Sequence, residues 1–272
     1  MSFALLRHAR SVNIRIVLPY DEAGTGKPVV LLHAGVGDRT MWREHLEPLA
    51  GAGLRVLAID LPGFGEAPIR PGPQAPWEDV LRTLRELEVE RAALVGNSFG
   101  AAVALRAAAV APAAVTGLVL VSVPPLAGET SPELEAAWTA EGAALDRGDI
   151  DGAVAAVVEA WTQPGAPAEL RERIASMQRR ALEAQVAAGD VEEAADPLER
   201  HPEALAKLEM PVLLVTGEHD MPDFKRSAEE LTATLPQARS VEINGAGHLA
   251  PLEDPLAFRD LLLDFLDNEL AG

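Results

Sequence analysis

The sequence predicts an α/β protein built on a parallel, doubly wound sheet. Short apolar segments alternate with helical segments along most of the chain. The apolar segments, which we expect to be strands, are residues 28–33, 54–60, 92–96, 115–122, 211–216 and 240–244. Most of them are apolar at nearly every position, as is typical of strands whose two faces are both covered by helices. Alternation of strands with helices favours parallel pairing through crossover connections.

Helical patterns follow most of these strands. They are expected at residues 41–50, 77–87, 101–110, 224–235 and 255–266. The second of them carries Val80, Leu81, Leu84 and Leu87 at helical spacing, which indicates one apolar face packed on a sheet. A chain of 272 residues is long enough for one large α/β domain with an inserted lobe.

The alternation breaks between residues 123 and 205, where no strand is evident. Helices are expected there at residues 131–145, 150–161 and 168–186. Ser131 suits the N-cap of the first of these helices, and Pro132 suits its first position. The sequence therefore predicts a core made of residues 1–122 and 206–272, with a helical lobe at residues 123–205.

Composition and charge exclude several classes of protein. The formal net charge of -19 repels phosphate backbones and anionic lipid, so we expect neither nucleic acid nor a membrane as partner. Without cysteine there is no thiol catalysis, disulfide or thiolate metal site. Neither a metal-ligand spacing nor a dinucleotide-binding glycine pattern is evident, so no metal or other cofactor is expected. Residues 1–10 lack the long apolar segment of a signal peptide, which favours a cytoplasmic location.

The most specific motif is Gly-Asn-Ser-Phe-Gly at residues 96–100. It follows an apolar strand and precedes a helix, which is the setting that lifts a serine hydroxyl above a sheet on a tight turn. Glycine two residues before and after the serine removes side chains that would clash in such a turn. The motif therefore predicts Ser98 as a nucleophile.

A serine nucleophile needs a base and an orienting carboxylate. His248 lies in a glycine-rich turn between the last strand and the last helix, so it is the predicted base. Asp220 follows the strand at residues 211–216 and is the predicted acid. Asp223 competes for that role, although it is also placed to cap the helix that follows.

Backbone amides of Phe99 and Gly35 are the predicted donors to an oxyanion. Gly35 lies in the glycine-rich loop after the first strand, where His33 is expected to organise the loop rather than act as a base. Trp138 and Trp161 lie on helices of the lobe. Each is a candidate for lining a substrate pocket, with core packing as the alternative.

The motifs described above, and their order along the chain, resemble those of the α/β-hydrolase superfamily. Residues 28–37 look like its first buried strand and oxyanion loop, with Ala34 where glycine is usual. Residues 59–65 look like its Asp-x-x-Gly-x-Gly turn. Residues 217–220 and 245–248 resemble its acid and histidine loops. The resemblance implies an α/β-hydrolase fold, a mostly parallel sheet flanked by helices, with an inserted helical cap over the site.

The resemblance implies hydrolysis of a small or medium carboxylic ester, lactone or thioester through an acyl-enzyme. Asn97 lies directly before the predicted nucleophile. Asparagine at this position resembles hydrolases that cleave carbon–carbon bonds in ring-fission diketones, so that activity is the first alternative. A binding or receptor-like protein and a cyclase or perhydrolase are the others, since one fold serves many functions. The partner expected in every case is a small molecule.

Overall fold

The computed structural model describes residues 17–269, and it confirms the α/β prediction. Seven strands form one sheet in the order β1-β3-β2-β4-β5-β6-β7, and all pairs are parallel except the pair of β1 with β3. The strands are β1 (Tyr20–Ala23), β2 (Lys27–Leu32), β3 (Leu54–Ile59), β4 (Ala92–Asn97), β5 (Val115–Val121), β6 (Val212–Gly217) and β7 (Ala238–Ile243). The apolar segments predict β2 to β7, whereas β1 is short, contains two acidic residues and carries no apolar run.

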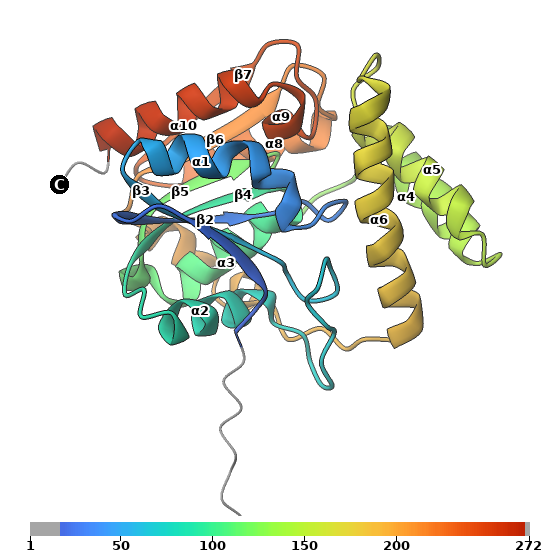
Figure 1. Cartoon of the computed structure of the whole chain (residues 1–272), viewed down its shortest axis with the longest axis horizontal. Coiled ribbons are helices and arrows are strands. Elements are labelled where there is room, and N and C mark those ends of the chain that lie inside the picture. The colour runs from blue at the N-terminus through green and yellow to red at the C-terminus, as the bar shows by residue number, and fades with distance from the viewer. Residues whose placement is uncertain (1–16, 270–272) are drawn as a thin grey trace, which may run out of the picture.

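Helices cover both faces of the sheet (Figure 1). Helices α1 (Arg43–Gly51) and α10 (Pro255–Glu269) pack on one face, and α2 (Pro76–Glu86), α3 (Phe99–Val110) and α8 (Pro222–Thr234) pack on the other. Strand β4 shows why its segment is apolar throughout. Leu94 belongs to the cluster beneath α2 and α3, while Ala93 and Val95 belong to the cluster beneath α1 and α10.

Three helices stand beside the sheet rather than on it (Figure 1). They are α4 (Pro132–Leu145), α5 (Ile150–Trp161) and α6 (Ala168–Ala188), and we refer to them as the cap helices. Ser131 occupies the N-cap of α4, as predicted, and its hydroxyl accepts a hydrogen bond from the Leu134 amide at 3.2 Å. These helices supply most of the expected lobe, and buried residues such as Val154 of α5 and Ile174 of α6 share an apolar cluster with Trp42 of the core.

The last part of the expected lobe returns to the core. It contains α7 (Pro197–Arg200) and a 3₁₀ turn, η3 (Pro202–Lys207), whose Leu198 and Leu205 join the apolar cluster that includes α3. Arg106 of α3 also forms an ion pair with Asp196. The remaining short elements are η1 (Arg39–Trp42), η2 (Pro112–Ala114) and α9 (Ala250–Glu253).

No helix within residues 17–269 is long and apolar enough to cross a membrane. The signal-peptide expectation concerns residues 1–10, which lie outside the described residues, as do the first 16 residues of the predicted core.

The turn between β4 and α3 leaves no room for a side chain at Gly96 or Gly100. Ser98 has a φ of 52° and a ψ of -113°, a conformation that residues other than glycine rarely adopt. A Cβ built on Gly96 would overlap the backbone of Gly100, and one built on Gly100 would overlap the carbonyl oxygen of Leu32 in β2. Glycine at both positions is therefore required by close backbone approach.

We predict that Gly100→Ala strongly destabilises the protein, because β2 and α3 would have to separate in a close-packed core. Gly142→Ala is the matched control. Gly142 lies inside α4 with nothing within 4 Å of an added Cβ, so this change should stabilise the helix by about 0.5–1 kcal/mol. Free energies of unfolding from denaturant titrations measure both effects. A Gly100→Ala protein as stable as wild type would contradict the steric argument.

Candidate active site

Ser98, Asp220 and His248 follow β4, β6 and β7, at the edge of the sheet where parallel strands end. Nδ1 of His248 lies 2.9 Å from Oδ1 of Asp220. Ser98 and His248 both border one cavity, which has a volume of about 420 Å³. Residues that are 150 positions apart in the sequence are thus brought together at one site.

The Asp220 carboxylate is held in a fixed orientation. Its Oδ1 accepts hydrogen bonds from the His248 ring and from the backbone amide of Met221, both at 2.9 Å, and the side chain is fully buried. Since Nδ1 of His248 carries the proton donated to Asp220, Nε2 is the ring nitrogen left to accept a proton. This is the arrangement that a general base requires.

His248 is also fixed by its backbone and its ring faces. Its carbonyl oxygen accepts hydrogen bonds from Asn97 Nδ2 and Ser122 Oγ, both at 3.1 Å. Its ring centroid lies 4.3 Å from that of Phe224 and 4.5 Å from that of Trp161. From the sequence, Asn97 is a sign of substrate type only, and Ser122 is not among the predicted site residues. The position of Ser122 at the end of β5, beside the serine turn, is the signal that could have found it.

The two predicted oxyanion donors lie close together. Phe99 is the first residue of α3, so its amide has no acceptor within the helix. Gly35 lies in the loop after β2 and borders the same cavity as Ser98. A Cβ built on Gly35 would lie 3.5 Å from the Cβ of Phe99, an ordinary van der Waals distance, so the two residues are neighbours.

His33 organises this loop, as predicted. Its Nε2 accepts a hydrogen bond from the Leu61 amide at 2.9 Å, and its Nδ1 donates to the carbonyl oxygen of Ala34 at 2.8 Å. The side chain is fully buried, and burial lowers the pKa of His33 below the ordinary 6.5. A ring with one donating and one accepting nitrogen is neutral, so His33 has no free nitrogen with which to act as a base.

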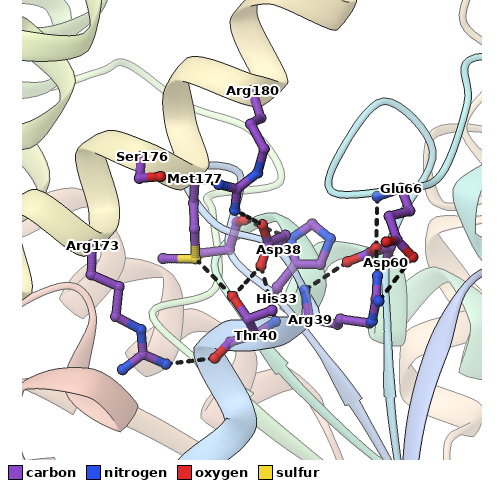
Figure 2. A network of polar contacts seen from close by, with 11 residues as sticks. His33, Asp38, Arg39, Thr40, Asp60, Glu66, Arg173, Ser176, Met177 and Arg180 are labelled. Carbon is purple, nitrogen blue, oxygen red and sulfur yellow. Dashed lines mark hydrogen bonds and ion pairs between the residues drawn. The ribbon is translucent and has the colours of Figure 1, made fainter.

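Ion pairs tie the same loop to the end of β3 (Figure 2). Asp60 is fully buried and accepts hydrogen bonds from the backbone and guanidinium of Arg39 and from the backbone amide of Glu66. Although burial acts to lower it, the pKa of Arg39 is raised by the charges of Asp60 and Asp21. Gly65 has a φ of 55° and lies directly against Asp60, which accounts for the glycine in the Asp-x-x-Gly-x-Gly turn.

The cap helix α6 binds the same loop from the other side (Figure 2). Arg180 forms an ion pair with Asp38, and Arg173 donates to the carbonyl oxygen of Thr40, each at 2.5 Å. Burial acts to raise the pKa of Asp38, but hydrogen bonds from Thr40 and Arg180 lower it below its ordinary value. The loop that carries Gly35 is therefore attached both to the sheet and to α6.

The two tryptophans border the cavity in different ways. Trp138 on α4 is 52% exposed, so its ring is not packed in a core. Trp161, at the end of α5, is 9% exposed and contacts Phe224 and His248 while it also borders the cavity. Packing and cavity lining are thus combined at Trp161.

Asp223 does not cap α8, and that expectation is wrong. Helix α8 begins at Pro222 with Met221 at its N-cap, while the buried Asp223 side chain accepts hydrogen bonds from the Ser131 amide and from Arg226. Asp223 instead joins α8 to the residue that precedes α4. No local pattern indicates this bond, because its partners are 92 residues apart.

The cavity wall is mostly apolar, and its charged groups are acidic. Glu129 and Glu141 border it, whereas no lysine or arginine among residues 17–269 does so. The same residues contain no group of three or more His, Cys, Asp or Glu side chains that could hold a metal ion.

The family model for the alpha/beta hydrolase fold matches residues 27–255, so the chain belongs to this family. It is 28% identical over 267 residues to the 2-hydroxy-6-oxononadienedioate/2-hydroxy-6-oxononatrienedioate hydrolase of Cupriavidus pinatubonensis, covering 91% of this chain and 90% of that protein. A thermophilic esterase from Thermogutta terrifontis has a TM-score of 0.74 and 27% identity over 92% of this chain and 93% of its own. Est816, described as an N-acyl homoserine lactone degrading enzyme, has a TM-score of 0.72 and 25% identity over 91% and 96%.

Substitution of Asp220 should lower activity, whereas substitution of Asp223 should lower stability. We predict that Asp220→Asn lowers kcat for ester hydrolysis by about 10⁴-fold while the fold persists, because the His248 ring loses the carboxylate charge that fixes its tautomer and stabilises its protonated form. Asp223→Ala should lower the free energy of unfolding by about 1–3 kcal/mol and keep most of kcat, because it leaves the Ser131 amide unpaired. Kinetics and thermal midpoints of both variants test the assignment. An inactive Asp223→Ala protein beside an active Asp220→Asn protein would reverse it.

Buried histidines should make the protein less stable in mild acid. Burial lowers the pKa values of His33 and His45 below the ordinary 6.5. As the pH falls below 6.5, the unfolded chain binds protons that the folded chain does not, so the free energy of unfolding decreases by up to about 1.4 kcal/mol per pH unit for each ring. The decrease ends once the pH is below the folded pKa.

Denaturant titrations from about pH 8 down to about pH 5.5 measure this effect. His45→Gln should remove one ring's share of the slope, whereas the exposed His219→Gln should leave the slope unchanged. Equal slopes for wild type and His45→Gln would show that His45 does not contribute.

Proposed function

We propose that the protein is a serine hydrolase that cleaves a carboxylic ester, lactone or thioester through an acyl-enzyme. One observation carries the proposal. Ser98, held on a tight turn at the start of α3, borders the same cavity as His248, whose ring is hydrogen-bonded to Asp220. The family of the chain and its similarity to an esterase support the same conclusion.

In the proposed mechanism, Ser98 Oγ attacks the carbonyl carbon while His248 Nε2 takes the hydroxyl proton. Asp220 holds the ring and stabilises the imidazolium that forms. The amides of Phe99 and Gly35 donate hydrogen bonds to the oxyanion, and each such donor is worth about 10²–10³ in kcat. His248 then protonates the leaving alcohol, and water, activated by the same ring, hydrolyses the acyl-enzyme.

The cap helices are proposed to control which substrates reach Ser98. Trp138, Trp161 and Gln178, which come from α4, α5 and α6, border the cavity together with Ser98. The division of the chain into a hydrolase core and a substrate-selecting cap is part of this proposal. Loops and inserted elements on a rigid sheet commonly carry specificity in this way.

Carbon–carbon bond hydrolysis is the second candidate, favoured by Asn97 and by the similarity to the Cupriavidus enzyme. The name of that enzyme describes dioate substrates, which carry two carboxylates. The cavity of the present chain offers Glu129 and Glu141 and, among the described residues, no lysine or arginine. Placing a carboxylate beside acidic groups that no cation offsets is unfavourable, so an ester without a carboxylate fits the cavity better.

We predict that Ser98→Ala lowers kcat for p-nitrophenyl esters by about 10⁴-fold or more, because the triad acts as a unit. An organophosphonate should modify wild type at Ser98, as measured by peptide mass mapping. Ser240→Ala, an exposed position on β7, is the matched control and should keep wild-type activity. Normal turnover by Ser98→Ala, or an adduct on another residue, would exclude the mechanism. Ligand binding without turnover by wild type would favour a receptor-like role.

A further inference from the structure

A polar pair, one side chain buried and the other half-buried, interrupts the apolar wall of the cavity at the cap helices. Gln178 of α6 and Glu141 of α4 both border the cavity that contains Ser98. Gln178 is only 4% exposed, and its Nε2 donates to Oε1 of Glu141 over a long 3.4 Å. The mechanism proposed above uses neither side chain.

The side-chain oxygen of Gln178 accepts no hydrogen bond within the described residues. That oxygen, Oε1, is buried. Buried polar atoms are nearly always hydrogen-bonded, because an unmade bond in the interior is destabilising. Because Gln178 is one of the residues that line the cavity, a group bound there is the source to which we assign the missing donor.

The chemistry of the pair defines that donor. Gln178 Oε1 and the carboxylate of Glu141 are both acceptors, and no lysine or arginine among the described residues borders the cavity. Burial raises the pKa of Glu141, because its carboxylate has lost water and gained only the long bond from Gln178. A hydroxyl or N–H group beside the pair would supply the donor that Gln178 Oε1 lacks, and an amine, with more than one proton, could also donate to Glu141, whereas a carboxylate would be repelled.

We propose that Glu141 and Gln178 form a subsite for a hydrogen-bond donor, a hydroxyl or N–H group, on the part of the substrate that extends from the scissile carbonyl into the cap. The inference rests on the proposed hydrolysis at Ser98 and narrows its substrate class. Preferred substrates are esters or lactones with a hydroxyl, amide or amino group on the chain. Plain alkyl esters are poorer substrates, and esters that carry a carboxylate are the poorest.

Methyl esters of straight-chain acids, from butanoate to octanoate, test the subsite. At each length the ester is compared in three forms, with a terminal hydroxyl, a terminal methoxy group that only accepts, and a terminal amine. At the best length, wild type should prefer the hydroxyl form over the methoxy form by about tenfold in kcat/KM. Comparison of the amine form with the hydroxyl form distinguishes a charged donor from a neutral one. A preference for either of these forms over the methoxy form supports the subsite.

Substitution of the pair should remove the preference selectively. Gln178→Leu and Glu141→Gln keep side chains of similar size, and Gln178→Leu should reduce the hydroxyl-to-methoxy ratio to about one. Glu141→Gln should reduce the preference for the amine form more than that for the hydroxyl form. Glu172→Gln, an exposed acidic position on α6 that does not line the cavity, is the control and should leave both ratios unchanged. An unaltered ratio in Gln178→Leu would overturn the proposal.

A binding measurement separates failure of the subsite from failure of the proposed function. In titration calorimetry, Ser98→Ala should bind the hydroxyl ester about tenfold more tightly than the methoxy ester, and the added Gln178→Leu change should abolish that difference. If wild type cleaves no ester but this binding preference is found, the hydrolase proposal fails and the subsite stands. If esters are cleaved but neither kcat/KM nor Kd distinguishes the two forms, the subsite is overturned. Equal or absent binding of both forms to Ser98→Ala also overturns it.

Discussion

The close approach of backbones around Ser98 is the constraint on which the site depends. Strand β4 turns into α3 with a single residue between them, and that residue has a positive φ. Backbone strain of this kind persists only when the surrounding structure determines it. Here Ser98 donates its amide to Val121 of β5 at 2.8 Å, while Gly100 lies against Leu32 of β2. Neighbouring strands on both sides therefore hold the turn that presents the proposed nucleophile and the Phe99 amide.

The other half of the site is held by polar contacts as well as by apolar packing. The loop after β2 is fixed through His33, through the pairing of Arg39 with Asp60, and through the pairing of Arg180 with Asp38. Removal of one partner from a buried ion pair leaves an uncompensated charge, so such pairs tolerate little change in geometry. Because Arg180 belongs to α6, the position of the cap and the position of the Gly35 amide are linked by the same carboxylate network (Figure 2).

Local patterns in the sequence predict what local physics determines. Continuous apolar runs indicate strands covered on both faces, Ser131 marks the start of α4, and the glycines at residues 96 and 100 mark the serine turn. Strand β1 is not predicted from the sequence, because its stability comes from pairing with β3 rather than from its own composition.

Hydrogen bonds between residues far apart in the sequence cannot be predicted, for a different reason. Asp223 pairs with Ser131, 92 residues away, and Asn97 with the carbonyl oxygen of His248, 151 residues away. Polar side chains of this kind have several possible partners, and only the folded chain selects one. The chemistry of the proposed triad could thus be predicted, but the residues that position it could not.

Substrate selectivity then depends on which part of the substrate makes the favourable contacts. A donor bound by Glu141 and Gln178 would be held by α4 and α6, while the carbonyl of the same substrate would lie between Ser98 and the Gly35 amide. Binding energy from a part of the substrate that does not react can hold the reacting carbonyl in an attacking geometry. Since α6 also holds the Gly35 loop through Arg180 and Asp38, a donor that draws α4 and α6 together would act on the same framework that orients the oxyanion donor. A substrate lacking the donor would bind the reacting centre without that orientation, and the difference would appear in kcat/KM.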